Sequence, residues 1–339
     1  MGIPGYAGKV LYIDLTTGAS REEALDPEWV RTLIGGWGIN NRLAYDLIPP
    51  QVDPYAPENL IIVGTGPFVG TMVPGGAEVL ATTKFPINNA FATGAGGGSF
   101  ALRLKSAGYD HVVISGRARS PVYLAIGSRG PELRNAQNLW GKDAFEVDDE
   151  LRSRYEPCGV ISMGPAGENL VRFSIAAVDK AGTLGRGGLA SVMGSKNLKA
   201  VVALQGGQGI EVAHRVKLER LLNALHDRVM AWPGRKTLLE RGMAELEDGL
   251  QQVHCRHRKV MACPSCPVGE KEMVRLEEGP YAGLVTYLPH FNPVELGCRT
   301  PSEAYGQAVK YLDALNRLGL CRVSFGALLS WLVRLHGEG

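Results

Sequence analysis

Two cysteines separated by two residues are the side chains in this sequence that most clearly indicate chemistry. Cys263 and Cys266 lie in the stretch MACPSCPVGEK, residues 261–271, and each is followed by a proline. A C-x-x-C turn brings both sulfur atoms to one side, and the prolines prevent the stretch from continuing as a helix. Two thiolates can bind one metal centre, but a zinc ion or an iron–sulfur cluster requires further donors. The stretch therefore supplies half of a metal site.

Other metal-binding residue types precede this turn. His254, Cys255 and His257 lie a few residues before it. Together with Cys263 and Cys266 they permit a zinc site. The same residues also permit an iron–sulfur cluster completed by other groups, or no metal at all, so three alternatives stay open.

The composition is that of a globular protein with two domains. The chain has 339 residues, of which 45% are hydrophobic, and this exceeds one ordinary core. Lysine and arginine number 36 against 34 acidic residues, so the charge favours neither nucleic acid nor an anionic membrane as a partner. We find no signal peptide or membrane-spanning run, and six cysteines are too few for a disulfide framework, so we expect a cytoplasmic protein.

The region that must position the cysteine turn is predicted to be residues 1–207. It contains strands, helices and glycine-rich turns. Alternating β-branched residues predict strands, and capping patterns predict helices. The expected strands are 9–15, 60–63, 79–83 and 111–115, and the expected helices are 27–34, 40–47 and 99–107. Two glycine-rich stretches, 93–98 and 185–188, are interpreted as loops whose N–H groups can bind an anion.

This first region contains an internal repeat. Residues 160–165, VISMGP, echo residues 62–67, IVGTGP, and the segment that starts at Leu189 parallels the one that starts at Ser99. The copies are separated by roughly 90 to 98 positions. We therefore predict a duplication in which a glycine-rich loop, a helix and a strand recur in the same order. Lys105, Lys196 and Lys199 are expected as charges on helix surfaces.

Residues 208–339 are predicted to form a partial all-α domain. The expected helices are 216–230, 235–250, 302–318 and 325–335. The last of these is apolar on nearly every side, and such a helix belongs inside a larger protein. Either other parts of the chain cover it or a partner does, so we expect a homo- or hetero-oligomer that forms through this helix.

Seven segments in order resemble the tungsten-dependent aldehyde:ferredoxin oxidoreductase family. They are GKVLYIDLTTG (8–18), LIGGWGINNRLAYDLIPPQVDPYAPEN (33–59), TGPFVGTMVP (65–74), GYDHVVISGRA (108–118), LWGKDAFE (139–146), GPAGENLVRF (164–173) and GRGGLASVMGSKNLKAV (185–201). The resemblance implies an α+β fold, in which two stacked, duplicated sheets form the base for two pterins and helical domains follow. It also implies oxidation of an aldehyde to a carboxylate at tungsten, with electrons leaving through a 4Fe-4S cluster to ferredoxin.

The resemblance also implies site residues. Cys263 and Cys266 correspond to two cluster ligands. The positions that correspond to pterin contacts are Ala95, Gly96 and Gly97 in the first glycine-rich stretch, Arg186, Gly187 and Gly188 in the second, and Asn316 and Leu320 in the motif NRLGLC. An N-x-x-G-L motif is also typical of a helix C-terminus with Gly319 at the cap, and the glycine stretches are also typical of turns.

The sequence departs from the family pattern at charged positions. Glu270 stands where a third cluster cysteine is expected, and a carboxylate is a poor ligand for iron–sulfur iron. Glu78 stands where the family has an arginine between pterin and cluster, Ala95 replaces an asparagine, and Asn316 replaces an aspartate. Glu78 opposes cofactor binding by its charge, and Asn316 cannot supply the carboxylate that would pair with a pterin. The change at Ala95 alone decides little, because a backbone carbonyl survives it.

Two hypotheses follow for the function. In the first, the chain is part of a working oxidoreductase of the family whose C-terminal half is supplied by another chain or lies outside this one. In the second, it is a structural or assembly subunit without cofactor beside a full-length relative. Only the first portion of the family's helical part matches this sequence. We therefore predict that the isolated chain does not oxidise aldehydes, and the sequence does not identify the aldehyde.

Overall fold

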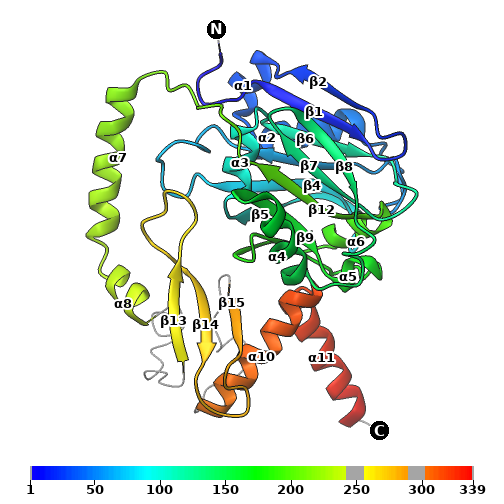
Figure 1. The fold of residues 1–339 in the computed structure, drawn as a ribbon, viewed down its shortest axis with the longest axis vertical. Coiled ribbons are helices and arrows are strands. Elements are labelled where there is room, and N and C mark those ends of the chain that lie inside the picture. The colour runs from blue at the N-terminus through cyan, green and yellow to red at the C-terminus, as the bar shows by residue number, and fades with distance from the viewer. Residues whose placement is uncertain (1, 242–255, 289–301, 338–339) are drawn as a thin grey trace.

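Two six-stranded mixed sheets form the N-terminal region of the computed structural model, which describes residues 2–241, 256–288 and 302–337 (Figure 1). The first sheet has the order β2-β1-β6-β3-β4-β5 and the second the order β11-β10-β9-β12-β7-β8. The strands of the first are β1 (Lys9–Asp14), β2 (Ser20–Ala24), β3 (Ile61–Thr65), β4 (Glu78–Phe85), β5 (Ala90–Gly97) and β6 (His111–Ser115). Those of the second are β7 (Val122–Gly127), β8 (Gly130–Asn135), β9 (Cys158–Met163), β10 (Ala176–Val178), β11 (Gly182–Leu184) and β12 (Leu198–Leu204).

The two sheets have the same topology, which confirms the internal duplication. When the second order is reversed, β8, β7, β12, β9, β10 and β11 take the places of β2, β1, β6, β3, β4 and β5. In each sheet one pair is parallel, β1 with β6 and β7 with β12, and the remaining pairs are antiparallel. The expected two-sheet α+β fold is therefore present.

The largest hydrophobic core lies between the sheets. Its buried side chains come from both sheets and from the helices α3 (Phe100–Ser106) and α6 (Leu189–Ser195) that follow β5 and β11. Leu104 and Val192 contribute from these helices, and each is fully buried. Because each sheet carries apolar residues on its inner face, the two copies bury their surfaces against each other.

Local sequence signals mark the residues at which the outer helices of this region begin. The Asp26 carboxylate accepts a hydrogen bond from the Glu28 N–H at 2.7 Å, and Pro27 is the first residue of α1 (Pro27–Leu33). α2 (Gly36–Leu47) follows at once and begins earlier than expected. A capping box formed by Asp143 and Glu146 begins α4 (Ala144–Tyr155), and α5 (Pro165–Glu168) is a single turn.

The glycine-rich stretch 93–98 is not the loop that the sequence suggested, because residues up to Gly97 belong to β5. This strand pairs with β4 in the register Leu80 to Ala95 and Glu78 to Gly97. A Cβ atom at Gly94 would lie 2.8 Å from the Gly185 carbonyl oxygen, so the glycines permit the backbones of the two copies to touch. The stretch 185–188 is a loop, as expected.

Three lysines expected at the surface are fully buried instead. The amino group of Lys105 donates to the carbonyl oxygens of Gly5 and Gly66, both at 2.6 Å, and lies 3.6 Å from Asp110. Lys196 donates to two carbonyl oxygens, and Lys199 pairs with Glu168. The sequence pattern does not reveal these contacts because the partners are distant in the chain.

The second part contains the expected helices together with a sheet that was not expected. The helices are α7 (Arg215–Met230), α8 (Gly234–Arg241), α10 (Ser302–Leu318) and α11 (Arg322–Gly337), and residues 242–250 lie outside the described residues. The antiparallel strands β13 (Arg256–Met261), β14 (Lys271–Leu276) and β15 (Val285–Leu288) correct the all-α prediction. Buried Lys271 and Glu272 interrupt the apolar alternation of β14, which concealed the strand.

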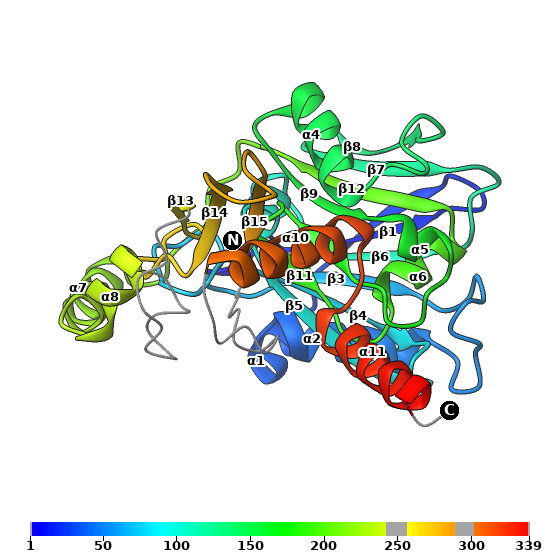
Figure 2. The same cartoon turned by 90° about the horizontal axis from the view of Figure 1, so that it is seen from below.

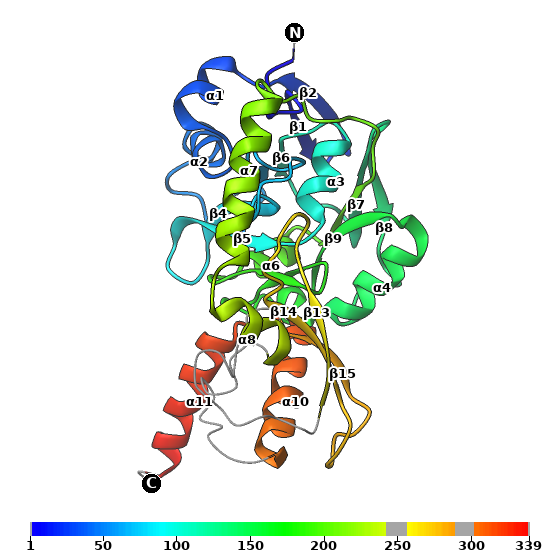
Figure 3. The same ribbon diagram turned by 90° about the vertical axis from the view of Figure 1, so that its left-hand side faces the viewer.

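Two helices of the second part lie at the outside of the molecule. α7 runs along one side of the N-terminal region, and α11 points away from it toward the C-terminus (Figures 1 and 3). α11 has no buried residue, and Trp331 and Val333 are 50% and 63% exposed. The described residues of this chain therefore leave the expected apolar helix uncovered. No helix in the described ranges is long and apolar enough to cross a membrane.

Candidate functional site

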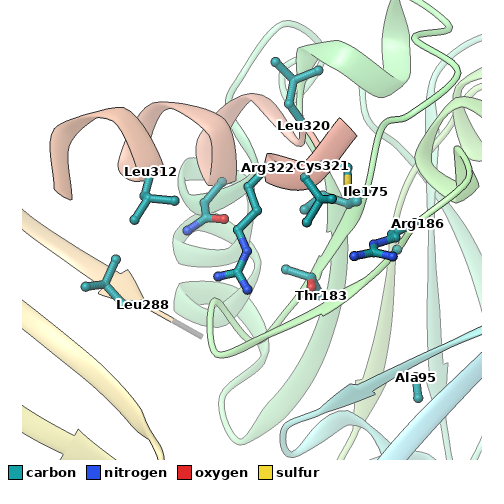
Figure 4. A pocket seen from close by; sticks show the side chains of 12 residues that line it. Ala95, Ile175, Thr183, Arg186, Leu288, Leu312, Leu320, Cys321 and Arg322 are labelled. Carbon is teal, nitrogen blue, oxygen red and sulfur yellow. The ribbon is translucent and has the colours of Figure 1, made fainter. Parts of the chain in front are cut away.

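A cavity of about 270 Å³ lies where the second part meets both copies of the duplication. Ala95 of β5 and Arg186 of the loop after β11 line one side, and Asn316 of α10, Leu320 and Arg322 line the other. Figure 4 shows Leu312, Leu320 and Arg322 across the cavity from Thr183, Arg186 and Ala95. Four of the eight positions that the resemblance assigns to pterin contacts therefore meet in one place.

The C-terminal end of α10 is held against the second copy by backbone hydrogen bonds. The Ile175 N–H donates to the Gly319 carbonyl oxygen at 2.8 Å, and the Cys321 N–H donates to the Phe173 carbonyl oxygen at 3.1 Å. Gly319 has a φ of 78°, which ends the helix in the left-handed conformation. The cap expected from N-x-x-G-L is thus present, and it directs Asn316 and Leu320 toward the cavity. α10 lies beside β11 and β15 in Figure 2.

Charged contacts also fix α10. Arg317 donates through Nε to Asp313 at 2.8 Å and through Nη1 to Asp143 at 3.2 Å. Asp313 lies one helical turn earlier, whereas Asp143 caps α4 in the N-terminal region. The Asn316 amide donates to the Tyr287 carbonyl oxygen at 3.4 Å. The ion pairs of Arg317 therefore fix the helix backbone from which the Asn316 amide extends.

The other four predicted glycines do not line this cavity. A Cβ atom at Gly187 would lie 3.0 Å from the Phe85 ring, and one at Gly188 would lie 2.4 Å from the Arg172 carbonyl oxygen. Gly96 and Gly97 are buried in β5. In the described structure these glycines allow close packing of the chain on itself.

The cavity has a donor set that suits an anion. Arg186 is exposed and Arg322 is half-buried, and no aspartate or glutamate is among the described residues that line it. Guanidinium groups bind phosphate through paired N–H donors, and an amide adds both a donor and an acceptor. The residues present therefore fit an anionic cofactor such as a pterin phosphate. Arg322 was not predicted, although it directly follows the NRLGLC motif.

The predicted metal ligands lie in the turn between β13 and β14. The Cys266 N–H donates to the Cys263 carbonyl oxygen at 3.0 Å, and Ser265 adopts a φ of 63° between them. The amino group of Lys271 donates to Cys263 Sγ at 3.0 Å and to the Gly97 carbonyl oxygen at 3.0 Å. Lys271 is only 2% exposed. A buried amine therefore occupies space beside the first sulfur atom.

These described residues do not fit a 4Fe-4S cluster. Cys263 lines a second cavity, which Cys266 does not line, and Glu270 stands at the third ligand position. The described residues contain no group of three or more His, Cys, Asp or Glu side chains placed to hold a metal ion. His254 and Cys255 of the alternative zinc site lie outside the described residues, as do Cys298 and residues 289–301.

The second cavity has a volume of about 440 Å³ and contains buried carboxylates. Asp148 is 1% exposed, and burial raises its pKa to about 6, although Arg152 opposes this shift. Arg152 bridges Asp148, at 2.8 Å, to Asp179. Asp148 Oδ2 has no hydrogen-bond partner among the described residues. Glu78 is exposed at the start of β4 and pairs with Gly97, the residue whose carbonyl accepts from Lys271.

Comparison with known proteins identifies relatives over nearly all of this chain. Residues 10–205 match the model of the aldehyde ferredoxin oxidoreductase N-terminal domain. A tungsten-containing aldehyde ferredoxin oxidoreductase of Pyrococcus abyssi is 39% identical across 99% of this chain and 59% of its own length. The WOR-like subunit of an aliphatic sulfonate oxidoreductase of Pyrococcus furiosus is 29% identical across 98% of this chain and 60% of its own length.

A solved structure has the same fold. The active-site complex BamBC of benzoyl coenzyme A reductase, with 1,5-dienoyl-CoA, contains a chain that superposes with a TM-score of 0.80 and is 25% identical. The superposition covers 94% of this chain and 53% of that one. The present chain thus spans somewhat more than half the length of the relatives it matches.

Proposed function

Because this chain belongs to the aldehyde ferredoxin oxidoreductase family, we propose that it forms the base of a tungsten–pterin site and oxidises aldehydes only together with a further polypeptide. The observation that carries this proposal is the cavity in which Ala95, Arg186, Asn316 and Leu320 meet. These residues come from both copies of the duplication and from α10. A site shared by distant segments favours ligand binding over a local packing role.

The side chains of this cavity have distinct roles in the proposal. Arg186 and Arg322 bind phosphate oxygens of the pterin. Among the described residues, their guanidinium groups are the cations that line the cavity. Asn316 orients the pterin ring through its amide. The cofactor itself supplies the oxidation–reduction chemistry when it is bound. Leu312 and Leu320 exclude water from the same space.

We propose that the isolated chain does not turn over aldehydes. The chain spans 59% of the length of its Pyrococcus abyssi relative, and Glu270 stands at the position of the third cluster ligand. A ferredoxin-type acceptor would receive electrons from the complete assembly. We also place the boundary between the base and the second part near residue 207, between β12 and α7, and expect a cytoplasmic location.

Cofactor content of the anaerobically purified chain tests this function. We expect tungsten or molybdenum together with pterin, measured by elemental analysis and by fluorescence of the oxidised pterin. Arg186→Gln should lower the pterin content at least tenfold, because a charge-assisted bond is lost. The matched control Arg119→Gln, on the surface away from the cavity, should leave it unchanged.

The alternative is a structural or assembly subunit without cofactor. The exposed Glu78 carboxylate and the Lys271 amine beside Cys263 favour it. A wild-type chain with neither metal nor pterin, even after expression with tungstate and molybdate, would support this alternative and refute the proposed pterin base. Aldehyde oxidation by the isolated chain with an artificial electron acceptor would contradict the need for a further polypeptide.

The exposed apolar side chains of α11 support an interaction with that further polypeptide. Leu328, Leu329, Trp331, Leu332 and Val333 are between 38% and 63% exposed. We propose that the covering partner corresponds to the part of the relatives that this chain does not span, and a second copy of the chain is the competing outcome. The name of one relative includes the word subunit, which agrees with a multichain assembly.

Light scattering and binding of an apolar dye test the partner proposal. We expect the isolated chain to bind the dye, and co-expression with the C-terminal part of a relative to abolish dye binding and yield a complex. Homodimers that bury the dye site would assign α11 to a second copy. Monomers that bind no dye would contradict an interface on α11.

A further inference from the structure

The amine of Lys271 contacts both the cysteine turn directly before β14 and the end of β5, which is distant in sequence. It reaches the Gly97 carbonyl oxygen at the end of β5 and Cys263 Sγ in the cysteine turn, both at 3.0 Å, from its own position at the start of β14. The side chain is buried, so water does not compete for these contacts. In a buried environment both hydrogen bonds contribute more than at the surface.

The sulfur atom of Cys263 is closely surrounded by other parts of the chain. A Cβ atom at Gly97 would lie 2.6 Å from Cys263 Sγ and 2.9 Å from Lys271 Nζ, so the sulfur is packed against β5 as well as against the amine. The remaining open side faces the 440 Å³ cavity, which Cys266 does not line. A C-x-x-C pair binds one metal only where both sulfur atoms reach the same space.

We propose that residues 261–271 form a clamp without metal, in which the Lys271 amine takes the bridging role that a metal centre would have between the second part and the first copy. The clamp ties the turn between β13 and β14 to the end of β5. Its components are one cation, one sulfur acceptor and one carbonyl acceptor, a hydrogen-bonded set with no requirement for a third cysteine. Glu270 at that position is then compatible with the fold.

The clamp also has a positional consequence. Gly97 pairs with Glu78 and lies two residues from Ala95, which lines the pterin-type cavity. Holding the Gly97 carbonyl therefore holds the end of the strand that contributes Ala95. The contacts of the clamp do not depend on whether the other cavity holds a cofactor.

A double-mutant cycle tests the direct contact. Lys271→Met keeps the length of the side chain and removes the donor, and Cys263→Ala removes the acceptor. We expect the pair to be coupled at least tenfold in the folding equilibrium constant, because the bond involves a charged group. Lys271→Met combined with the matched control Cys266→Ala should be additive within about twofold. Additivity of Lys271→Met with Cys263→Ala would overturn the clamp.

If Lys271→Met does not fold, the variant Cys263→Ser tests the same contact. Cys263→Ser retains an acceptor for the amine, so we expect its folding equilibrium constant to stay above that of Cys263→Ala. A serine variant as unstable as the alanine variant would overturn the clamp, since restoring an acceptor for the amine would then restore no stability.

Iron binding provides an independent measurement. The wild-type chain and the Cys263→Ala/Cys266→Ala variant are incubated with ferrous iron and sulfide without oxygen. We expect both to retain equally little iron after desalting. Iron and visible cluster absorption in the wild type that the double variant lacks would overturn the inference. Tungsten and pterin are measured separately, so failure of the clamp is distinguishable from failure of the proposed pterin base.

Discussion

Each copy of the duplication buries an ion pair at one equivalent strand position, with an anion there in the first copy and a cation in the second. His111 pairs with Gly64 in the first sheet and Ala200 pairs with Ser162 in the second, so the preceding residues, Asp110 and Lys199, are equivalent. In the first copy the anion Asp110 lies 3.6 Å from Lys105, and in the second the cation Lys199 pairs with Glu168. This position therefore accommodates a buried charge of either sign where a partner of opposite charge neutralises it.

The copies differ more at the ends of β5 and β11. β5 is the longer strand, and its last carbonyl accepts from Lys271 in the cysteine turn. β11 ends at Leu184, which leaves Gly185 and Arg186 in a loop beside the pterin-type cavity. Thus the same topology supports a clamp in one copy and contributes a cation to a cavity in the other.

Removal of one buried lysine is expected to have the largest effect on stability. Lys199→Met leaves Glu168 buried without its cation, although the Gly141 N–H still donates to it at 2.9 Å. Breaking a buried pair in this way costs about 3–5 kcal/mol of unfolding free energy. Urea unfolding measures the loss, and Lys217→Met on exposed α7 is the matched control with little expected change.

The comparison is sharpened by variants in both copies. Lys105→Met should destabilise the first copy by a similar amount, since its side chain and that of Asp110 are both fully buried. Adding Glu168→Gln to Lys199→Met should recover part of the lost stability, because the unpaired charge is removed. Equal stability of Lys199→Met and Lys217→Met would show that the second ion pair has no structural role.

Sequence patterns were sufficient where local signals determine the structure. Asp26 followed by Pro27 predicted the start of α1, and apolar spacing predicted helix 302–318 with the bounds that α10 has. The repeated motif at residues 62–67 and 160–165 predicted the duplication. These signals involve neighbours within a few residues, and short-range geometry is what a linear pattern describes.

Long-range contacts were the part that the patterns missed. The glycines of β5 were predicted to form a loop. The backbone of the second copy, which they approach closely, is distant in the sequence. Lys105, Lys196 and Lys199 resembled surface charges because the carbonyl and carboxylate groups that they contact are distant. Asn316 and Arg186 share a cavity although 130 positions separate them, and only family resemblance suggested that contact.

Alkaline pH provides a second comparison between the copies. Burial lowers the pKa of Lys105 and of Lys196 from the usual 10.5 to about 8 in each case. The unfolded chain therefore binds more protons between pH 8 and pH 10.5, so the unfolding free energy should rise with pH in that window. Each lysine contributes at most about 3 kcal/mol to this rise.

Variants separate these lysines from other groups that titrate at alkaline pH. Lys196→Met should reduce the slope of unfolding free energy against pH between pH 8 and pH 10.5, whatever its effect at a single pH. Lys217→Met should keep the wild-type slope because that residue is exposed. An unchanged slope in Lys196→Met would mean that burial of this amine in the second copy has no cost.

The contact between β5 and β11 gives the smallest expected effect and the most direct test of how the copies are joined. A Cβ atom at Gly182 would lie 2.3 Å from the Gly97 carbonyl oxygen, which is backbone and cannot move aside alone. Gly182→Ala should therefore lower the unfolding free energy by about 1–3 kcal/mol. Gly207→Ala, with no atom within 4 Å of the added carbon, is the matched control.

Because the Gly97 carbonyl also accepts from Lys271, Gly182→Ala combined with Lys271→Met should lower the unfolding free energy by less than the sum of the two single changes. Strict additivity in denaturant unfolding would mean that the junction of the copies and the cysteine turn are independent.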